Sequence, residues 1–125
     1  MVTVFPTLKY DDAHAAIEFL TTVLGFEKHA VYEDDDGEVA HAELSHGDGM
    51  VMLSDRRGES DRYETGRAVV YVVVEDPDAL HERAKAAGAQ IVAELADQDY
   101  GSRDFAAADP EGNIWSFGTY NPTTP

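Results

Sequence analysis

The stretch "HAELSH", residues 41–46, holds the densest group of side chains that could do chemistry. Because side chains alternate along a strand, His41 and Glu43 are predicted to share one face and His46 the other, unless a bulge turns it. His41 and Glu43 could contact a ligand, act as an acid–base pair or, joined by His46, bind a metal. They could equally be polar residues on a half-exposed strand whose other face packs under a helix.

Other reactive groups are sparse. The chain has no cysteine, which excludes disulfides, thiolate zinc sites and cysteine nucleophiles. No Gly-x-Ser-x-Gly motif is present, and "GDG" and "DPEG" are typical of hairpin turns rather than phosphate-binding loops. His14, His29 and His81 are predicted to be surface residues.

The charge balance is strongly acidic, with 25 Asp and Glu against 9 Lys and Arg and a formal net charge of −16. Such a surface repels phosphate backbones and anionic lipid and attracts cations, so neither nucleic acid nor a membrane is expected as a partner. The acidic residues are scattered along the chain instead of lining one segment, so adaptation to a salty environment is an alternative explanation of the net negative charge. No segment is apolar for long enough to cross a membrane, and a cytoplasmic location is expected.

The order of predicted elements occurs twice. Each half reads as a strand, a helix and three strands; the first half is 3–10, 11–26, 28–33, 39–46 and 50–54, and the second is 67–75, 76–88, 89–95, 102–109 and 113–120. The glycines that end the helices, Gly25 and Gly88, are 63 residues apart, and so are the turn glycines Gly49 and Gly112. Equal spacing and equal order indicate a duplicated unit.

This pattern predicts an α+β fold. Two tandem βαβββ modules would form a curved, mostly antiparallel eight-stranded sheet around a concave cavity, with the helices outside. The chain is expected to be a single domain, 1–125, with module one at about 1–55, a polar connector at about 55–66 and module two at about 67–120.

Three segments, "LKYDDAHAAIEFLTTVLGFE", "VEDPDALHERAKAAGA" and "DPEGNIWSFGTY", resemble the vicinal oxygen chelate superfamily, and the resemblance covers essentially the whole chain. This superfamily includes glyoxalase I, the extradiol dioxygenases, fosfomycin resistance enzymes and bleomycin resistance proteins. The resemblance implies paired βαβββ modules, a homodimer and, in metal-using members, ligands at four strand positions that face the cavity.

In this sequence those four positions fall at Phe5, Leu53, Val69 and Ser116, with Met52 in place of Leu53 if the register slips by one. Phe, Leu and Val side chains have no lone pair to donate, and one Ser hydroxyl is a poor sole ligand for a divalent metal. The pattern is therefore closest to the metal-free, bleomycin-resistance-like members, and neither a metal nor another cofactor is expected.

Aromatic side chains supply the predicted binding surface. Tyr71 shares strand parity with Val69, and Tyr120 shares it with Ser116, whereas Trp115 and Phe117 are expected beneath a helix. Tyr63 in the connector could be a lid or mere surface. The complete set of predicted ligand-binding residues is Phe5, His41, Glu43, Leu53, Val69, Tyr71, Tyr100, Arg103, Phe105, Ser116 and Tyr120, with Tyr100, Arg103 and Phe105 at the rim.

These features predict a small-molecule-binding protein without catalytic residues. It would sequester a cationic or aromatic compound such as an antibiotic. The alternative is a metal-dependent or metal-free lyase, isomerase or dioxygenase-type enzyme of the same superfamily, which would use His41 and Glu43 as an acid–base pair or as unusual ligands.

Overall fold

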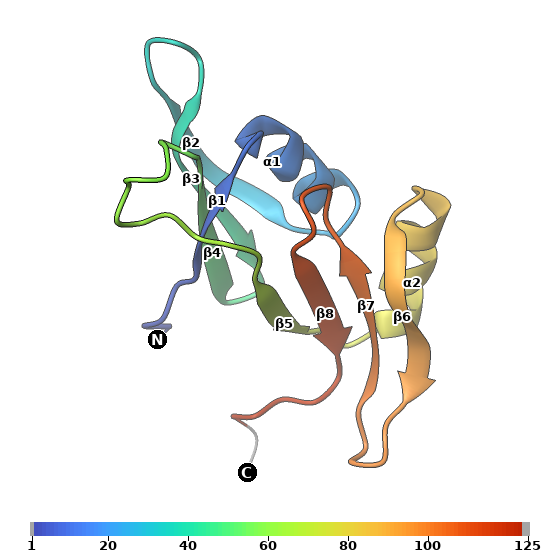
Figure 1. Ribbon diagram of the computed structural model, residues 1–125. Helices are drawn as coiled ribbons and strands as arrows, with labels where there is room; N and C mark the ends of the chain where they lie inside the picture. The colour runs from blue at the N-terminus through green and yellow to red at the C-terminus, as the bar shows by residue number, and fades with distance from the viewer. Residues whose placement is uncertain (1, 124–125) are drawn as a thin grey trace. The chain divides into compact units, whose positions relative to one another are not determined.

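Each half of the chain folds as one strand, one helix and three further strands (Figure 1). The computed structural model describes residues 2–123 and divides into two compact units, Met1–Ala68 (unit 1) and Val69–Pro125 (unit 2). The predicted α+β fold of two βαβββ modules is confirmed. The eight strands are shared between two separate four-stranded sheets, whereas the sequence predicted one eight-stranded sheet.

Unit 1 contains β1 (Thr7–Tyr10), α1 (Ala13–Thr22), β2 (Glu27–Glu33), β3 (Val39–His46) and β4 (Gly49–Asp55). Its strand order is β1-β4-β3-β2. β2, β3 and β4 form an antiparallel meander, in keeping with the mostly antiparallel pairing that the sequence predicts, and β1 joins its edge by pairing in parallel with β4.

Unit 2 contains β5 (Val69–Val73), α2 (Pro77–Ala86), β6 (Gln90–Asp97), β7 (Arg103–Ala108) and β8 (Ile114–Gly118). Its strand order is β5-β8-β7-β6, with β5 parallel to β8 and the other pairs antiparallel. The two units therefore share one topology.

The helices of both units begin in the same way. The carboxylates of Asp12 and Asp76 accept hydrogen bonds from the backbone N–H groups of Ala15 and Ala79, three residues into each helix. Such caps satisfy backbone donors that have no partner within the helix. The duplication is therefore visible in local chemistry as well as in topology.

Each sheet has one face under its own helix, which we call the helix face. In unit 1 the carboxylate of Asp55 accepts the N–H of Ala13, the first residue of α1, at 2.8 Å. Strand alternation puts Leu53 on the same face as Asp55, and Leu53 is 1% exposed. In unit 2 the ring of His81 on α2 contacts Phe105 of β7, which marks the helix face there.

The opposite side of each sheet, which we call the open face, is not covered by that unit's helix. Trp115 and Phe117 lie on the helix face of unit 2, as predicted, and both are 0% exposed. Residues that alternate with them, such as Ser116, lie on the open face. Within residues 2–123, neither helix has the length and apolarity needed to cross a membrane.

Candidate functional site

The open face of unit 1 carries His41 and Glu43, as the strand alternation predicted. His41 Nε2 lies 2.9 Å from Glu43 Oε2, and the neighbouring residues Ala42 and Leu44 are buried on the helix face. The two side chains thus form a hydrogen-bonded pair, with His41 stacked against Tyr32 at a ring-centroid distance of 6.2 Å.

A second histidine approaches the same carboxylate. His29 Nε2 lies 3.7 Å from Glu43 Oε1. In the ladder, Lys28 pairs with Leu44 and Ala30 pairs with Glu43, so His29 is the extra residue of a β-bulge. The bulge brings an edge-strand residue to the pair, a contact that alternation alone did not predict.

The remaining histidines lie away from this pair. The ring of His46 packs against Phe26 with ring centroids 5.0 Å apart, and burial lowers the pKa of His46. The predicted surface position of His81 is wrong, because its side chain is 15% exposed and lies against Phe105. His14 is half exposed, and its contact with the carbonyl of Gly37 raises the pKa of His14.

Leu53 does not line the open face, which corrects the sequence prediction. It is buried on the helix face, and Met52 takes its place because Met52 pairs with Thr7 and with Glu43. Phe5 precedes β1 and is 41% exposed. The register alternative that placed Met52 in this position is the one that the structure adopts.

The connector after β4 folds back over the open face of unit 1. Lys9 N donates to Thr65 Oγ1 at 3.0 Å, and Lys9 Nζ lies 3.6 Å from Asp61 Oδ2. This leaves a cavity of about 410 Å³, lined by Thr7, Lys9, Ala40, His41, Ser54, Arg62, Tyr63, Glu64 and Thr65. Tyr63, predicted as a lid or as surface, lines the cavity and is 69% exposed.

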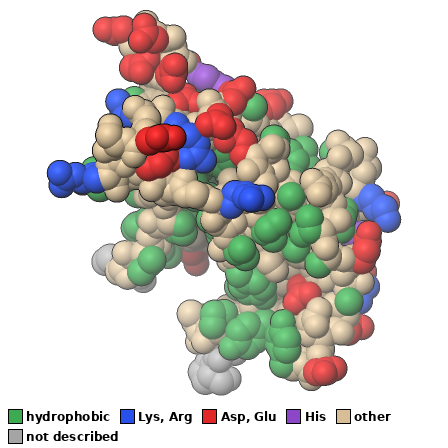
Figure 2. Space-filling view, in the orientation of Figure 1, with side chains coloured by type: hydrophobic (Ala, Val, Ile, Leu, Met, Phe, Trp, Pro, Cys, Tyr) green, Lys and Arg blue, Asp and Glu red, His purple; other side chains and the backbone are tan. Residues whose placement is uncertain are grey.

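The open face of unit 2 brings together the predicted aromatic residues. Val69 and Tyr71 project from the same side of β5, and Tyr71 pairs with Ser116 of β8. Val69 is 74% exposed and Tyr71 is 39% exposed. Figure 2 shows hydrophobic side chains gathered over β5 and β8.

Tyr71, Tyr100 and Tyr120 meet at one end of this face, and we call these three residues the tyrosine cluster. Tyr71 Oη donates to the carbonyl oxygen of Tyr120 at 2.7 Å, and the rings of Tyr100 and Tyr120 are 6.0 Å apart at 86°. Tyr100 Oη lies 3.3 Å from Asp104 Oδ2. Asp104 was not among the binding residues predicted from the sequence. It lies two residues before Ala106, which pairs with Ser116, so strand alternation places Asp104 on the open face as well.

Two predicted rim residues lie on the helix face instead. Phe105 is 1% exposed and stacks on Phe117 at 5.4 Å, so it belongs to the core. Arg103 Nε and Nη2 contact the two carboxylate oxygens of Asp78 at 2.7 and 3.1 Å, and Nη1 lies 3.2 Å from Asp97. The hydrogen bonds with Arg103 hold the pKa of Asp78 below its ordinary value. Arg103 therefore links β7 to α2 and does not contact the open face.

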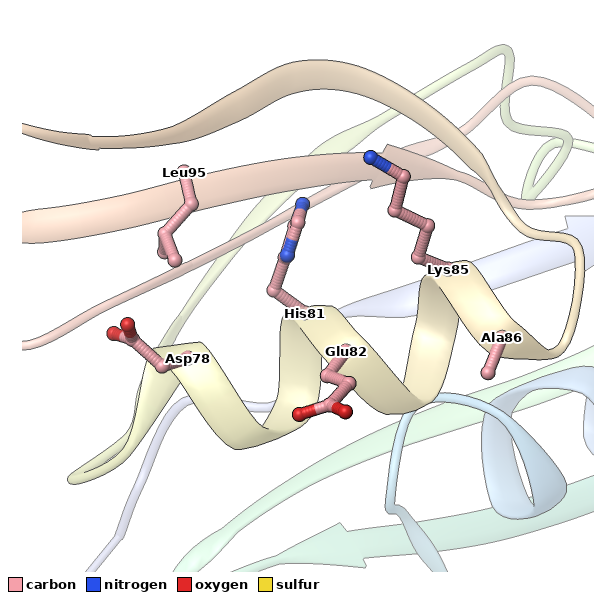
Figure 3. A pocket seen from close by; sticks show the side chains of 6 residues that line it. All are labelled: Asp78, His81, Glu82, Lys85, Ala86 and Leu95. Carbon is pink, nitrogen blue, oxygen red and sulfur yellow. The ribbon is translucent and has the colours of Figure 1, made fainter.

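A second cavity, of about 490 Å³, lies between α2 and β6 on the other side of unit 2. Figure 3 shows that five of its lining side chains project from α2, with Leu95 across from the helix. Two of the five are already engaged, because Asp78 pairs with Arg103 and His81 Nε2 lies 3.0 Å from Glu94 Oε1. The other polar side chains that line this cavity are Glu82 and Lys85, both exposed on α2.

The positions that the resemblance assigns to metal ligands carry Phe5, Met52, Val69 and Ser116, with Met52 in place of Leu53. Among them only the Met52 thioether and the Ser116 hydroxyl have lone pairs, and neither is a ligand that divalent metals prefer. Within the part of the chain that the structure describes, no three His, Asp or Glu side chains form a group suited to a metal ion.

Comparisons with known proteins agree with this architecture. Residues 5–117 match the family model described as "Glyoxalase/Bleomycin resistance protein/Dioxygenase superfamily". An uncharacterized protein of Mycobacterium bovis is 34% identical over 121 residues, which cover 90% of this chain and 80% of that protein.

Solved structures show the same fold. TioX from Micromonospora sp. ML1 has a TM-score of 0.83 at 31% identity, with 97% of this chain and 100% of that chain covered. A lactoylglutathione lyase from Agrobacterium tumefaciens has a TM-score of 0.70 at 21% identity, with 94% and 93% covered. The similarity to the lyase supports the fold alone.

Proposed function

Because the chain belongs to the Glyoxalase/Bleomycin resistance protein/Dioxygenase superfamily, we propose that it binds a small aromatic or cationic organic compound and sequesters it without chemical change. An antibiotic is one class of compound against which sequestration would protect. The observation that carries this proposal is the open face of unit 2, where aromatic and aliphatic side chains are exposed together.

The energetics of that face suit a flat organic molecule. Burial of apolar surface contributes roughly 25 cal/mol per Å², and contact with an aromatic ring adds about 1 kcal/mol. Val69, Tyr71 and Val73 offer such surface on one strand, with exposed fractions of 74%, 39% and 40%. A planar ligand that lies along β5 would cover all three, because residues 69, 71 and 73 follow one another on one face of the strand.

The polar chemistry also favours binding over metal-assisted catalysis. The donor set at Phe5, Met52, Val69 and Ser116 does not fit a divalent metal. The net charge of −16 raises the local concentration of cationic ligands. The proposal also includes a homodimer, as the resemblance to the superfamily implies, and a cytoplasmic location.

Isothermal titration calorimetry tests the proposal with three probes: ethidium as a planar cation, phenanthridine as a neutral relative and 1-naphthalenesulfonate as an anion. We expect saturable binding of ethidium, weaker binding of phenanthridine and none of the anion. Val69→Lys, which adds a charge and removes apolar surface, should weaken ethidium binding at least tenfold, or about 1.4 kcal/mol.

Ala86→Lys is the matched control for Val69→Lys, because it adds the same charge on α2, outside the open face. It should change ethidium binding less than twofold. If none of the three probes gives a saturable heat, the proposed function is wrong. If both lysine variants weaken ethidium binding equally, the loss reflects only the change in net charge, and the open face of unit 2 is not the binding site.

The His41–Glu43 hydrogen bond favours a second candidate, an enzyme of the same superfamily. A carboxylate that holds an imidazole in one orientation is the arrangement of a general acid–base pair. In that case His41→Ala and Glu43→Gln would lower turnover by orders of magnitude, whereas in a binding protein they would cost only a modest part of the affinity.

A further inference from the structure

We infer that the tyrosine cluster and Asp104 form a subsite for an alkylated ammonium group, so that the sequestered compound is an organic ammonium ion. This inference rests on the proposed function and specifies the chemistry of its ligand. The carboxylate of Asp104 supplies the negative charge, and the tyrosine rings supply the walls.

Sheet topology creates this subsite. Tyr71 of β5 and Asp104 of β7 lie on either side of Gly118 at the end of β8, and all three share the open face. A Cβ atom at residue 118 would lie 2.7 Å from Tyr71 Oη and 2.8 Å from Asp104 Cβ. A glycine at position 118 therefore leaves the room that the Tyr71 hydroxyl and the Cβ atom of Asp104 occupy.

The carboxylate of Asp104 is held by neutral donors. Gln98 Nε2 donates to its Oδ1 at 2.9 Å, and Tyr100 Oη lies 3.3 Å from its Oδ2. Among residues 2–123, no Lys, Arg or His side chain lies within ion-pair distance of Asp104. Its charge is therefore available to a cation that a ligand brings.

The hydroxyl group of Tyr100 remains a donor. Desolvation, followed by the charge of Asp104, raises the pKa of Tyr100 above its ordinary value, so the phenol stays protonated at neutral pH. A neutral phenol leaves Asp104 as the charged group of the subsite.

The aromatic walls favour an alkylated ammonium over other cations. The rings of Tyr100 and Tyr120 stand nearly perpendicular, at 86°, and form a corner beside the carboxylate. Ring faces attract cations within about 6 Å and stabilise methylated ammonium groups without hydrogen bonds. Each oxygen of Asp104 already accepts one hydrogen bond, which leaves less room for the bidentate contact that a guanidinium prefers.

Nuclear magnetic resonance titration with choline and with its uncharged isostere 3,3-dimethylbutan-1-ol tests the subsite, with amide shifts near Tyr71, Asp104 and Gly118 as the readout. The wild-type protein should bind choline at least tenfold more tightly than the alcohol. Asp104→Asn keeps the size of the side chain and removes its charge, so it should bring the two affinities within about twofold of each other.

Asp99→Asn is the matched control, because it removes the same charge from the exposed turn that precedes β7. It should leave the choline preference unchanged, and fluorescence of Trp115 should verify that each variant is folded. Absence of a preference for choline, or an equal loss in Asp99→Asn and Asp104→Asn, would overturn the inference.

The outcomes for the subsite and for the proposed function are separable. If ethidium or phenanthridine binds while choline shows no preference over the alcohol, the ammonium subsite is wrong and the proposed function stands. If no probe of either set binds, both are wrong.

Discussion

Replacing Asp109 by alanine is expected to cost about 3–5 kcal/mol of the free energy of unfolding, because it leaves several buried donors without their acceptor and each costs about 1–3 kcal/mol. Asp109 is 4% exposed, and its carboxylate accepts hydrogen bonds from the backbone N–H groups of Glu111 and Asn113, both at 3.0 Å. It also accepts the indole N–H of Trp115 at 3.1 Å.

Denaturant unfolding followed by tryptophan fluorescence measures this loss directly, since Trp115 is the sole tryptophan of the chain and is fully buried. Asp109→Asn retains one acceptor oxygen and should cost less than Asp109→Ala. Asp99→Ala, in an exposed turn, should change stability by less than about 0.5 kcal/mol. A loss below about 1 kcal/mol in Asp109→Ala would contradict the role assigned to this carboxylate.

Asp55→Ala is expected to destabilise unit 1 by about 2–4 kcal/mol, for a similar reason. Asp55 is 8% exposed, and its carboxylate accepts the N–H of Ala13 at 2.8 Å and the N–H of Val39 at 2.7 Å. It thereby ties the first residue of α1 and the first residue of β3 to the end of β4. Alanine would leave both buried N–H groups without an acceptor.

Circular dichroism during urea unfolding gives the overall loss for Asp55→Ala, and hydrogen exchange locates it. The amides of Ala13 and Val39 should exchange faster than in the wild-type protein. Asp35→Ala, in the exposed β2–β3 turn, removes an equal charge and should leave both amides protected. Unchanged protection of Ala13 and Val39 in Asp55→Ala would refute the assignment.

Local signals predicted the helices and the duplicated topology well. The caps Asp12 and Asp76 and the glycines that follow the helices act within a few residues, so the sequence alone specifies them. The equal spacing of Gly49 and Gly112 was less informative about turn geometry, because of these two glycines only Gly112 has a positive φ, of 88°. The division into two sheets depends on pairing between distant strands, which no local pattern specifies.

The site was predicted in part. The alternation of polar and apolar residues in "HAELSH" placed His41 and Glu43 on the correct face. In contrast, "MVMLS" is almost wholly apolar, so alternation could not show which of its residues face the helix. Leu53 was therefore predicted on the open face, where Met52 lies. Arg103 was misplaced because its partner Asp78 is 25 residues away on α2. For Phe105 a signal existed, since it pairs with Phe117, which was already predicted beneath a helix.

We propose that the open face of unit 2 binds an organic cation, and amide shift mapping with ethidium is the experiment that locates this binding. We predict saturable shifts at Val69–Val73 of β5 and Ile114–Gly118 of β8, with little change along α2. Shifts confined to α2 and β6, or to the His41–Glu43 pair in unit 1, would contradict this location. Shifts in neither unit at millimolar ethidium would contradict the binding of an organic cation.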